Sequence, residues 1–228
     1  MITPRKLNVA GVLLFLATLI VYLPSLKAGF LLDDSLWLHW NPLLKDLKGL
    51  FQIWASPFSF EVYYPVALTN FWIEYRLWHL DPFGYHLTSV LLHIANALLL
   101  WILLTKLNVP GAFFASLIFA LHPVQVEPVV WISQRKNLLS LFFYLLASLC
   151  FIRFYNLNSL SSFSRNQWRF YFFTLFLFLC SLLSKPTSCM FPIVALLLLW
   201  WQGRGIKRRD ILLLAPLFLM SLVLTWDS

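Results

Sequence analysis

The feature that most constrains this chain is a series of long apolar runs. A run of about 20 apolar residues is long enough to cross the hydrocarbon core of a bilayer as a helix. Seven such runs occur, at residues 7–26, 86–105, 108–124, 138–155, 169–184, 187–202 and 211–227. Only 11% of the 228 residues are charged, whereas about 25% is usual in a soluble domain. The sequence therefore predicts an all-α polytopic membrane protein, with about seven transmembrane helices in a single membrane domain over residues 1–228.

The third run is the weakest candidate. Its unbroken apolar core is only "GAFFASLIFAL", which would also suit a short or re-entrant helix. The first run follows Arg5 and Lys6 and resembles a signal peptide, but no convincing cleavage site follows it. We therefore expect it to be a retained helix.

The basic residues predict the orientation, because cytoplasmic loops carry an excess of Lys and Arg. With a cytoplasmic N-terminus, ten of the 17 basic residues lie inside, and eight of the nine acidic residues lie outside. The ten are Arg5, Lys6, Lys106, Arg153, Arg165, Arg169, Arg204, Lys207, Arg208 and Arg209. The basic cytoplasmic loop at 203–210, "GRGIKRRD", is the strongest anchor. The same count supports a real crossing by the third run, since without it this loop would lie outside.

Two large outer loops follow from this orientation, at residues 27–85 and 121–137. In the first, "DSLWLHWNPLLKDLKGLFQIW" mixes aromatics and leucines with Lys and Asp, which favours one or two interfacial helices along the membrane. The formal net charge of +8 reports topology here, so we expect no nucleic-acid partner.

The cysteines and histidines give no pattern of metal ligands. Cys150, Cys180 and Cys189 lie in or beside apolar runs, without a CxxC or Cys/His cluster, so we expect neither a disulfide framework nor a zinc site. His86 and His93 share a helical face with Asn96 nearby, and hydrogen bonds between helices are the favoured role there. The sequence leaves open whether a divalent metal is needed.

The stretch "AGFLLDDSLWLHW" places Asp33 and Asp34 at the border of an apolar run. One interpretation is a helix N-cap, in which a carboxylate accepts hydrogen bonds from free N–H groups. The other is a general base or metal ligand at the mouth of a cavity on the outer face. A carboxylate there would be wet enough to be charged, yet close enough to lipid to meet a lipid-borne substrate.

The second outer loop, "LHPVQVEPVVWISQRKNLLS", holds further candidates. Arg135 and Lys136 precede an apolar run and would be either headgroup anchors at a helix start or part of a phosphate-binding site. Cations there oppose both the helix macrodipole and the charge bias of the topology, which favours the phosphate-binding site. His122 and Glu127 would be an acid/base pair or simply a helix end and a turn, and the second interpretation is slightly favoured. Lys185, in "LLSKPTSCMFP", is either a snorkelling lysine or a further phosphate ligand.

The motifs "FLLDD", "YYPVALTNFWIEYRLWHLDPFGYHLTSVLLHIANALLL", "LHPVQVEPVVWISQRKNLLS" and "LLSKPTSCMFPIVALLLLWW" occur in this order. Together they resemble the membrane domain of the transmembrane, tetratricopeptide-repeat O-mannosyltransferase-like proteins, of the GT-C glycosyltransferase superfamily. The resemblance covers residues 25 to 205.

This resemblance implies a GT-C-like helical fold and a sugar donor carried on a polyprenyl phosphate. Asp33 or Asp34 would act as the base or orient the acceptor hydroxyl, and Arg135, Lys136 and Lys185 would hold the donor phosphate. Tyr64, in "YYPV" at 63–66, is a further candidate. The acceptor would be a protein Ser/Thr or a glycan on the outer face. Relatives continue into further spans and a helical repeat domain, so this chain would be a truncated or split gene product, or a partner polypeptide would supply the C-terminal remainder.

The leading hypothesis is therefore a membrane glycosyltransferase, or its N-terminal catalytic module, that transfers a sugar such as mannose. The alternative is a non-catalytic subunit that binds lipid-linked sugars. A transporter fits less well, because the spans carry few ionisable residues. We expect a bacterial inner membrane with a periplasmic site; an endoplasmic reticulum membrane with a luminal site would fit the charge pattern equally well.

Overall fold

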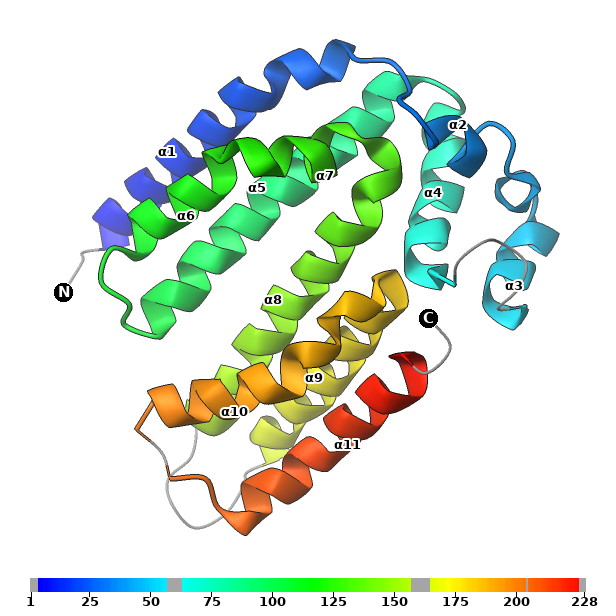
Figure 1. Cartoon of the computed structure of the whole chain (residues 1–228). Helices are drawn as coiled ribbons and strands as arrows, with labels where there is room; N and C mark the ends of the chain where they lie inside the picture. The colour runs from blue at the N-terminus through cyan, green and yellow to red at the C-terminus, as the bar shows by residue number, and fades with distance from the viewer. Residues whose placement is uncertain (1–3, 57–62, 157–164, 204, 226–228) are drawn as a thin grey trace. The chain divides into compact units, whose positions relative to one another are not determined.

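The computed structural model describes residues 4–56, 63–156, 165–203 and 205–225 (Figure 1). All elements in these ranges are α-helices or short 3-10 helices. Within the expected membrane domain, the chain divides into two compact units, residues 1–139 and 140–228. These findings confirm the all-α class.

The described residues of the first unit form seven complete α-helices and the start of an eighth. They are α1 (Pro4–Tyr22), α2 (Asp34–Trp37), α3 (Leu47–Ala55), α4 (Pro65–Trp78), α5 (Pro82–Lys106), α6 (Ala112–Leu121), α7 (Val126–Val130) and α8 (Arg135–Asn156). Four 3-10 helices join them: η1 (Leu23–Lys27), η2 (Pro42–Leu44), η3 (Pro123–Gln125) and η4 (Ile132–Gln134). The second unit contains the rest of α8, then α9 (Arg165–Ser184), η5 (Pro186–Met190), α10 (Phe191–Trp201) and α11 (Arg208–Thr225).

Four described helical segments are long and apolar enough to cross a membrane. They are Val9–Lys27, Pro82–Lys106, Ile132–Tyr155 and Gln167–Ser184. A fifth crossing results if Ala112–Leu121 and Pro123–Val130, bent by 53°, form one span, and Pro186–Trp201 is a shorter apolar helix. The polytopic membrane class is confirmed, whereas the count of seven spans stays a prediction.

The third apolar run does not form one straight helix, because the helix is interrupted before Pro123. α6 has only 10 residues, a length of about 15 Å, or half the hydrocarbon thickness of about 30 Å. It ends at Leu121 because Pro123 pushes the preceding residue, His122, out of the helical region. His122 indeed adopts an extended conformation, with φ −66° and ψ 134°.

In the first unit, α1, α5 and α6 lie side by side (Figure 1). Small residues permit the close approach, as where Gly11 on α1 faces the Trp101 ring on α5. Further along the chain, α2, η2, α3 and α4 surround a second group of buried side chains that includes Leu44, Phe71 and Tyr85. This group positions the outer segment between α1 and α5.

Several polar side chains inside the apolar helices form a hydrogen bond with a backbone carbonyl. Thr18, Ser116 and Thr174 each donate to the carbonyl four residues earlier. Asn96 donates to the carbonyl of Leu138 at 3.0 Å, and Nε2 of His93 lies 2.9 Å from the carbonyl of Ala120. These contacts confirm the expected hydrogen bonds between helices.

The second unit has an aromatic core. Phe151 of α8, Phe178 of α9 and Phe191 of α10 are buried together with Leu214 of α11. Phe178 and Phe191 are stacked with their ring centroids 4.9 Å apart. Such close packing explains why four helices rich in Phe and Leu converge here.

Candidate functional site

Two segments almost 100 residues apart in sequence are tied together by the carboxylates of Asp33 and Asp34. Oδ1 of Asp33 accepts hydrogen bonds from Nε1 of Trp131 at 2.7 Å and from the hydroxyl of Ser133 at 2.8 Å. Oδ1 of Asp34 accepts a bond from the backbone N–H of Ser133 at 2.7 Å. The two outer loops inferred from the sequence therefore meet at these acids.

The two acids differ in their exposure and in the use of their oxygens. Asp34 is fully buried, and its second oxygen accepts the N–H of Leu31 at 2.9 Å. Burial raises the pKa of Asp34, while the backbone N–H groups of Leu31 and Ser133 oppose this shift. Asp33 is half-buried, and its Oδ2 has no hydrogen bond to the described residues. Only Asp33 thus keeps an oxygen for another group.

The structure contradicts the N-cap interpretation of these acids. α2 begins at Asp34, and Asp33 at its N-cap position makes no side-chain capping hydrogen bond. The carboxylate of Asp34 turns back to Leu31, outside the helix. The reason is the availability of stronger partners: the segment around Ser133 offers three donors, and donors to a charged carboxylate make short, strong bonds.

The residue before the acids is held in an unfavourable backbone conformation. Leu32 has φ +45°, in the left-handed region that bulky residues rarely adopt. Its side chain is 81% exposed, so side-chain packing does not explain this conformation. The conformation is explained by the hydrogen bonds on either side of Leu32, which fix Asp33 and Asp34 after it and Leu31 before it. Such local strain is often found at functional sites.

Lys136 lies on the same segment as Ser133 and contacts the segment that carries Asp33 and Asp34. Its ammonium is 4.9 Å from the ring centroid of Trp37 and 5.7 Å from that of Tyr64. The two rings are stacked, with centroids 6.4 Å apart and an interplanar angle of 12°. Trp37 follows Asp33 by four residues, and Lys136 follows Ser133 by three. The structure thus groups Asp33, Lys136 and Tyr64 among the sequence-predicted candidates, and burial raises the pKa of Tyr64.

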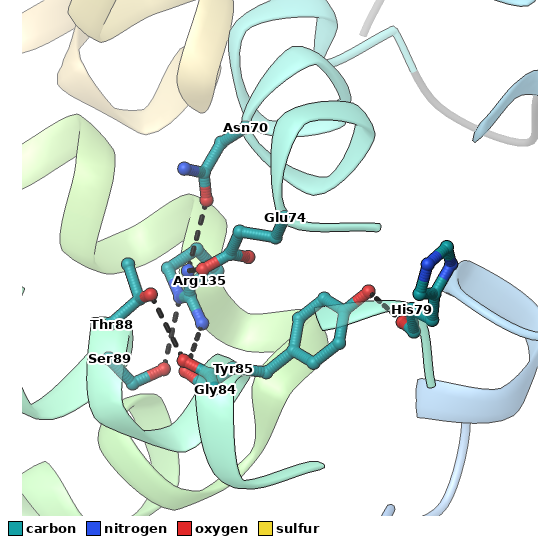
Figure 2. A network of polar contacts seen from close by, with 8 residues as sticks. All are labelled: Asn70, Glu74, His79, Gly84, Tyr85, Thr88, Ser89 and Arg135. Carbon is teal, nitrogen blue, oxygen red and sulfur yellow. Dashed lines mark hydrogen bonds and ion pairs between the residues drawn. The ribbon is translucent and has the colours of Figure 1, made fainter. Parts of the chain in front are cut away.

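Arg135 is fully buried and lies at the centre of a polar network (Figure 2). Nη1 of Arg135 donates to Glu74 at 2.7 Å and to Asn70 at 3.0 Å, both on α4. Nε donates to the hydroxyl of Ser89 at 3.0 Å, and Nη2 donates to the carbonyl of Tyr85 at 2.5 Å, both on α5. Its guanidinium is therefore turned into the protein.

Sequence reasoning missed the partners of these candidates: Asn70, Glu74, Ser89, Trp131 and Ser133. One signal was available for Glu74, because it is an acid within the apolar helical stretch "PVALTNFWIEYRLW". A buried acid normally needs a cationic partner. No local pattern identified that partner as Arg135, which is 61 residues further along the chain.

The remaining candidates of the second outer loop, His122 and Glu127, are both exposed. Nδ1 of His122 accepts the N–H of Val124 at 3.2 Å and caps η3, so His122 is a helix end, as expected. The expectation of a turn at Glu127–Pro128 is wrong, because α7 continues through both residues. Pro128 is tolerated there because the first N–H groups of a helix have no partner within the helix.

Lys185 belongs to the second unit, at the N-cap position of η5. Its side chain is half-buried, and its carbonyl accepts the hydroxyls of Ser188 at 3.2 Å and Ser140 at 3.4 Å. Its role as a phosphate ligand stays a prediction. Within the described residues, no three His, Cys, Asp or Glu side chains are grouped as metal ligands would be.

Curated proteins similar to this chain share the word O-mannosyl-transferase in their names. Protein O-mannosyl-transferase Tmtc1 of Drosophila melanogaster is 32% identical over 192 residues, which is 78% of this chain and 21% of the fly protein. The human protein O-mannosyl-transferase TMTC3 is 34% identical over 142 residues, 58% of this chain and 16% of that protein. Protein O-mannosyl-transferase F38B6.6 of Caenorhabditis elegans is 29% identical over 169 residues, 68% and 24% of the two chains.

These similarities confirm the resemblance inferred from the motifs. The chain matches only about a quarter or less of the length of these relatives. No protein-family model and no solved structure matches it.

Proposed function

Since the chain is related over 58–78% of its length to part of the protein O-mannosyl-transferases, we propose that it is the membrane module of a glycosyltransferase. It transfers a sugar, such as mannose, from a polyprenyl phosphate to a protein hydroxyl on the outer face. The observation that supports this proposal best is that the same two segments hold an oriented carboxylate, Asp33, and a cation, Lys136.

In this proposal Asp33 is the general base. Trp131 and Ser133 both bind Oδ1 and so fix the carboxylate plane, while Oδ2 accepts the proton of the acceptor hydroxyl. Asp34 has no oxygen to spare, since each accepts a backbone N–H. Its role is to hold Leu31 and Ser133 in place. The different bonding of the two acids thus separates a reacting carboxylate from a positioning one.

The reaction replaces one bond to the anomeric carbon by another. The acceptor oxygen attacks this carbon, its bond to the phosphate oxygen breaks, and the proton passes to Asp33. Negative charge grows on the departing polyprenyl phosphate, so a cation near it stabilises the transition state. Lys136 supplies this cation. Lys136 contacts Trp37, which follows Asp33 by four residues, so the base and the cation would lie on either side of the anomeric carbon.

The lipid donor and the polar acceptor reach this site from different phases. The polyprenyl chain stays in the bilayer, beside the apolar helices of the first unit, and the acceptor arrives from water. The outer face in this proposal is the periplasm of a bacterial inner membrane or the lumen of the endoplasmic reticulum.

The test uses the full chain in lipid nanodiscs with a radiolabelled polyprenyl-phosphate mannose and a Ser/Thr-rich peptide. Asp33→Asn keeps Oδ1 and both of its hydrogen bonds but removes the base, so we expect transfer to fall by at least about a hundredfold. Asp81→Asn is the matched control: Asp81 caps α5 through the N–H of Phe83 at 3.0 Å, and Asn caps equally well.

Equal transfer by wild type and Asp33→Asn would refute the role of Asp33 as the general base. Donor binding by the wild type without any transfer would instead support a non-catalytic subunit that binds lipid-linked sugars. Absence of both binding and transfer would refute the glycosyltransferase proposal.

A further inference from the structure

We propose that Arg135 is a positioning residue that fixes the geometry of the site and does not itself bind the donor phosphate. This inference rests on the proposed function for its catalytic meaning. It differs from what the sequence suggests, since a cation beside Lys136 at a helix start is an obvious phosphate ligand. The contacts of Arg135 assign it another task.

The first argument is that Arg135 is already occupied. Its side chain is 0% exposed, and its guanidinium donates to an amide oxygen, a carboxylate, a hydroxyl and a carbonyl. Glu74, itself buried, neutralises its charge at 2.7 Å. A phosphate could reach this guanidinium only by displacing these groups and leaving Glu74 buried without a cation, which is strongly unfavourable.

The second argument is the position of Arg135 in the chain. Two residues earlier, Ser133 binds Asp33 through its hydroxyl and Asp34 through its N–H. One residue later, Lys136 contacts Trp37 and Tyr64. Arg135 therefore lies between the groups that orient the base and the cation of the proposed leaving-group site. Any shift of Arg135 shifts both.

The third argument is the span of the network. Arg135 is the first residue of α8 and joins it to Asn70 and Glu74 on α4 and to Tyr85 and Ser89 on α5 (Figure 2). A cation is unfavourable at a helix N-terminus, so the carboxylate of Glu74 compensates this cost. The planar fork of an arginine can reach several partners in fixed directions, which a lysine cannot. The network thus fixes where α8 begins relative to both helices.

The test removes the whole pair at once, in the variant Glu74→Leu with Arg135→Met. Replacing a buried ion pair by apolar side chains of similar volume is often neutral for folding, so this variant separates positioning from stability. Arg76→Met is the matched control, because among the described residues Arg76 binds the carbonyls of Leu44 and Trp72 and the Trp72 ring and does not contact the site. Three quantities are measured in nanodiscs: amide hydrogen exchange at 131–137, donor affinity and transfer.

We expect exchange at Ser133 to accelerate by about tenfold or more, because its bond to Asp34 is loosened. Transfer should fall by about a hundredfold, the cost of roughly 1 Å of misplacement, while donor affinity changes by less than about threefold. The control variant should match wild type in all three. Because hydrogen exchange needs no activity, it tests the positioning of this segment even if the wild type transfers nothing.

Two outcomes would overturn the inference. Donor affinity weakened by about tenfold with unchanged exchange would make Arg135 a direct phosphate ligand. If the double variant exchanges and transfers as fast as wild type, the ion pair is only a replaceable part of the core. A wild type without transfer would refute the proposed function alone, and unchanged exchange at Ser133 would refute the positioning role alone.

Discussion

Asp33 and Asp34 are adjacent and chemically identical, yet their carboxylates are bound in different ways. Both donors to Asp33 converge on Oδ1, whereas Asp34 receives one backbone N–H on each oxygen. An Asn side chain has one oxygen and one NH₂ group. It can therefore replace Asp33 without losing a bond, but at position 34 its NH₂ group must face an N–H.

We therefore expect Asp34→Asn to lower the free energy of unfolding by about 1–3 kcal/mol, the usual cost of an unsatisfied buried polar group. Asp33→Asn should change it by less than about 0.5 kcal/mol, as is common for substitutions that leave buried contacts intact. Thermal unfolding of the two variants in the same detergent measures this difference. Equal destabilisation by both variants would contradict the bonding described for Asp34.

The residues around Arg135 also mark the limit of inference from sequence. Arg135 and Lys136 could be singled out because two general rules, the helix macrodipole and the charge bias, both disfavour cations at that position. The partner of Arg135 could not be found, because Glu74 is 61 residues away in the chain. Only the packing of α4, α5 and α8 brings the two together. The sequence identified the unusual residue, and the fold supplies its reason.

At the scale of the element, α3 confirms a helix in the region where an interfacial helix was expected. Leu47, Phe51 and Trp54 are 72%, 72% and 47% exposed, and they follow one another at helical spacing. Gly49 and Ile53 on the other face are buried, and Gly49 lies so close to the backbone of Leu43 that any side chain there would collide with it. One face of α3 is thus packed and the other is apolar and uncovered.

We expect this uncovered face to lie in the bilayer interface, at about 5–10 Å depth. A spin label at Phe51→Cys, in a background without native cysteines, should be accessible to oxygen in the lipid phase. A label at Lys45→Cys, ahead of the helix, should instead be accessible to a water-soluble relaxation agent. Electron paramagnetic resonance measures both accessibilities. If both labels report water, α3 does not contact the membrane.

At the scale of the whole molecule, the bonds of the site constrain how the first unit crosses the membrane. α5 has 25 residues and is about 37 Å long. Its start is bonded to Arg135 through Tyr85 and Ser89, while Lys106 is at its far end. The chain between Lys106 and Ile132 must therefore return along the full length of α5. Hydropathy alone left this third run ambiguous; the contacts of Arg135 favour a crossing over a re-entrant loop.

The return is made by α6 and the segment Pro123–Val130, which together have 18 residues and a helical length of about 27 Å, close to the hydrocarbon thickness. We therefore expect opposite ends of this bent pair to lie on opposite sides of the membrane.

A cysteine at Pro110, an exposed residue before α6, should react with an impermeant thiol reagent from the cytoplasmic side only. A cysteine at Val124, which is 68% exposed, should react from the outer side only. The two labels are compared in sealed vesicles of both orientations, with the native cysteines replaced. Reaction of both from one side would make the pair a re-entrant loop, and the assignment of "GRGIKRRD" to the cytoplasm, which depends on this crossing, would then be wrong.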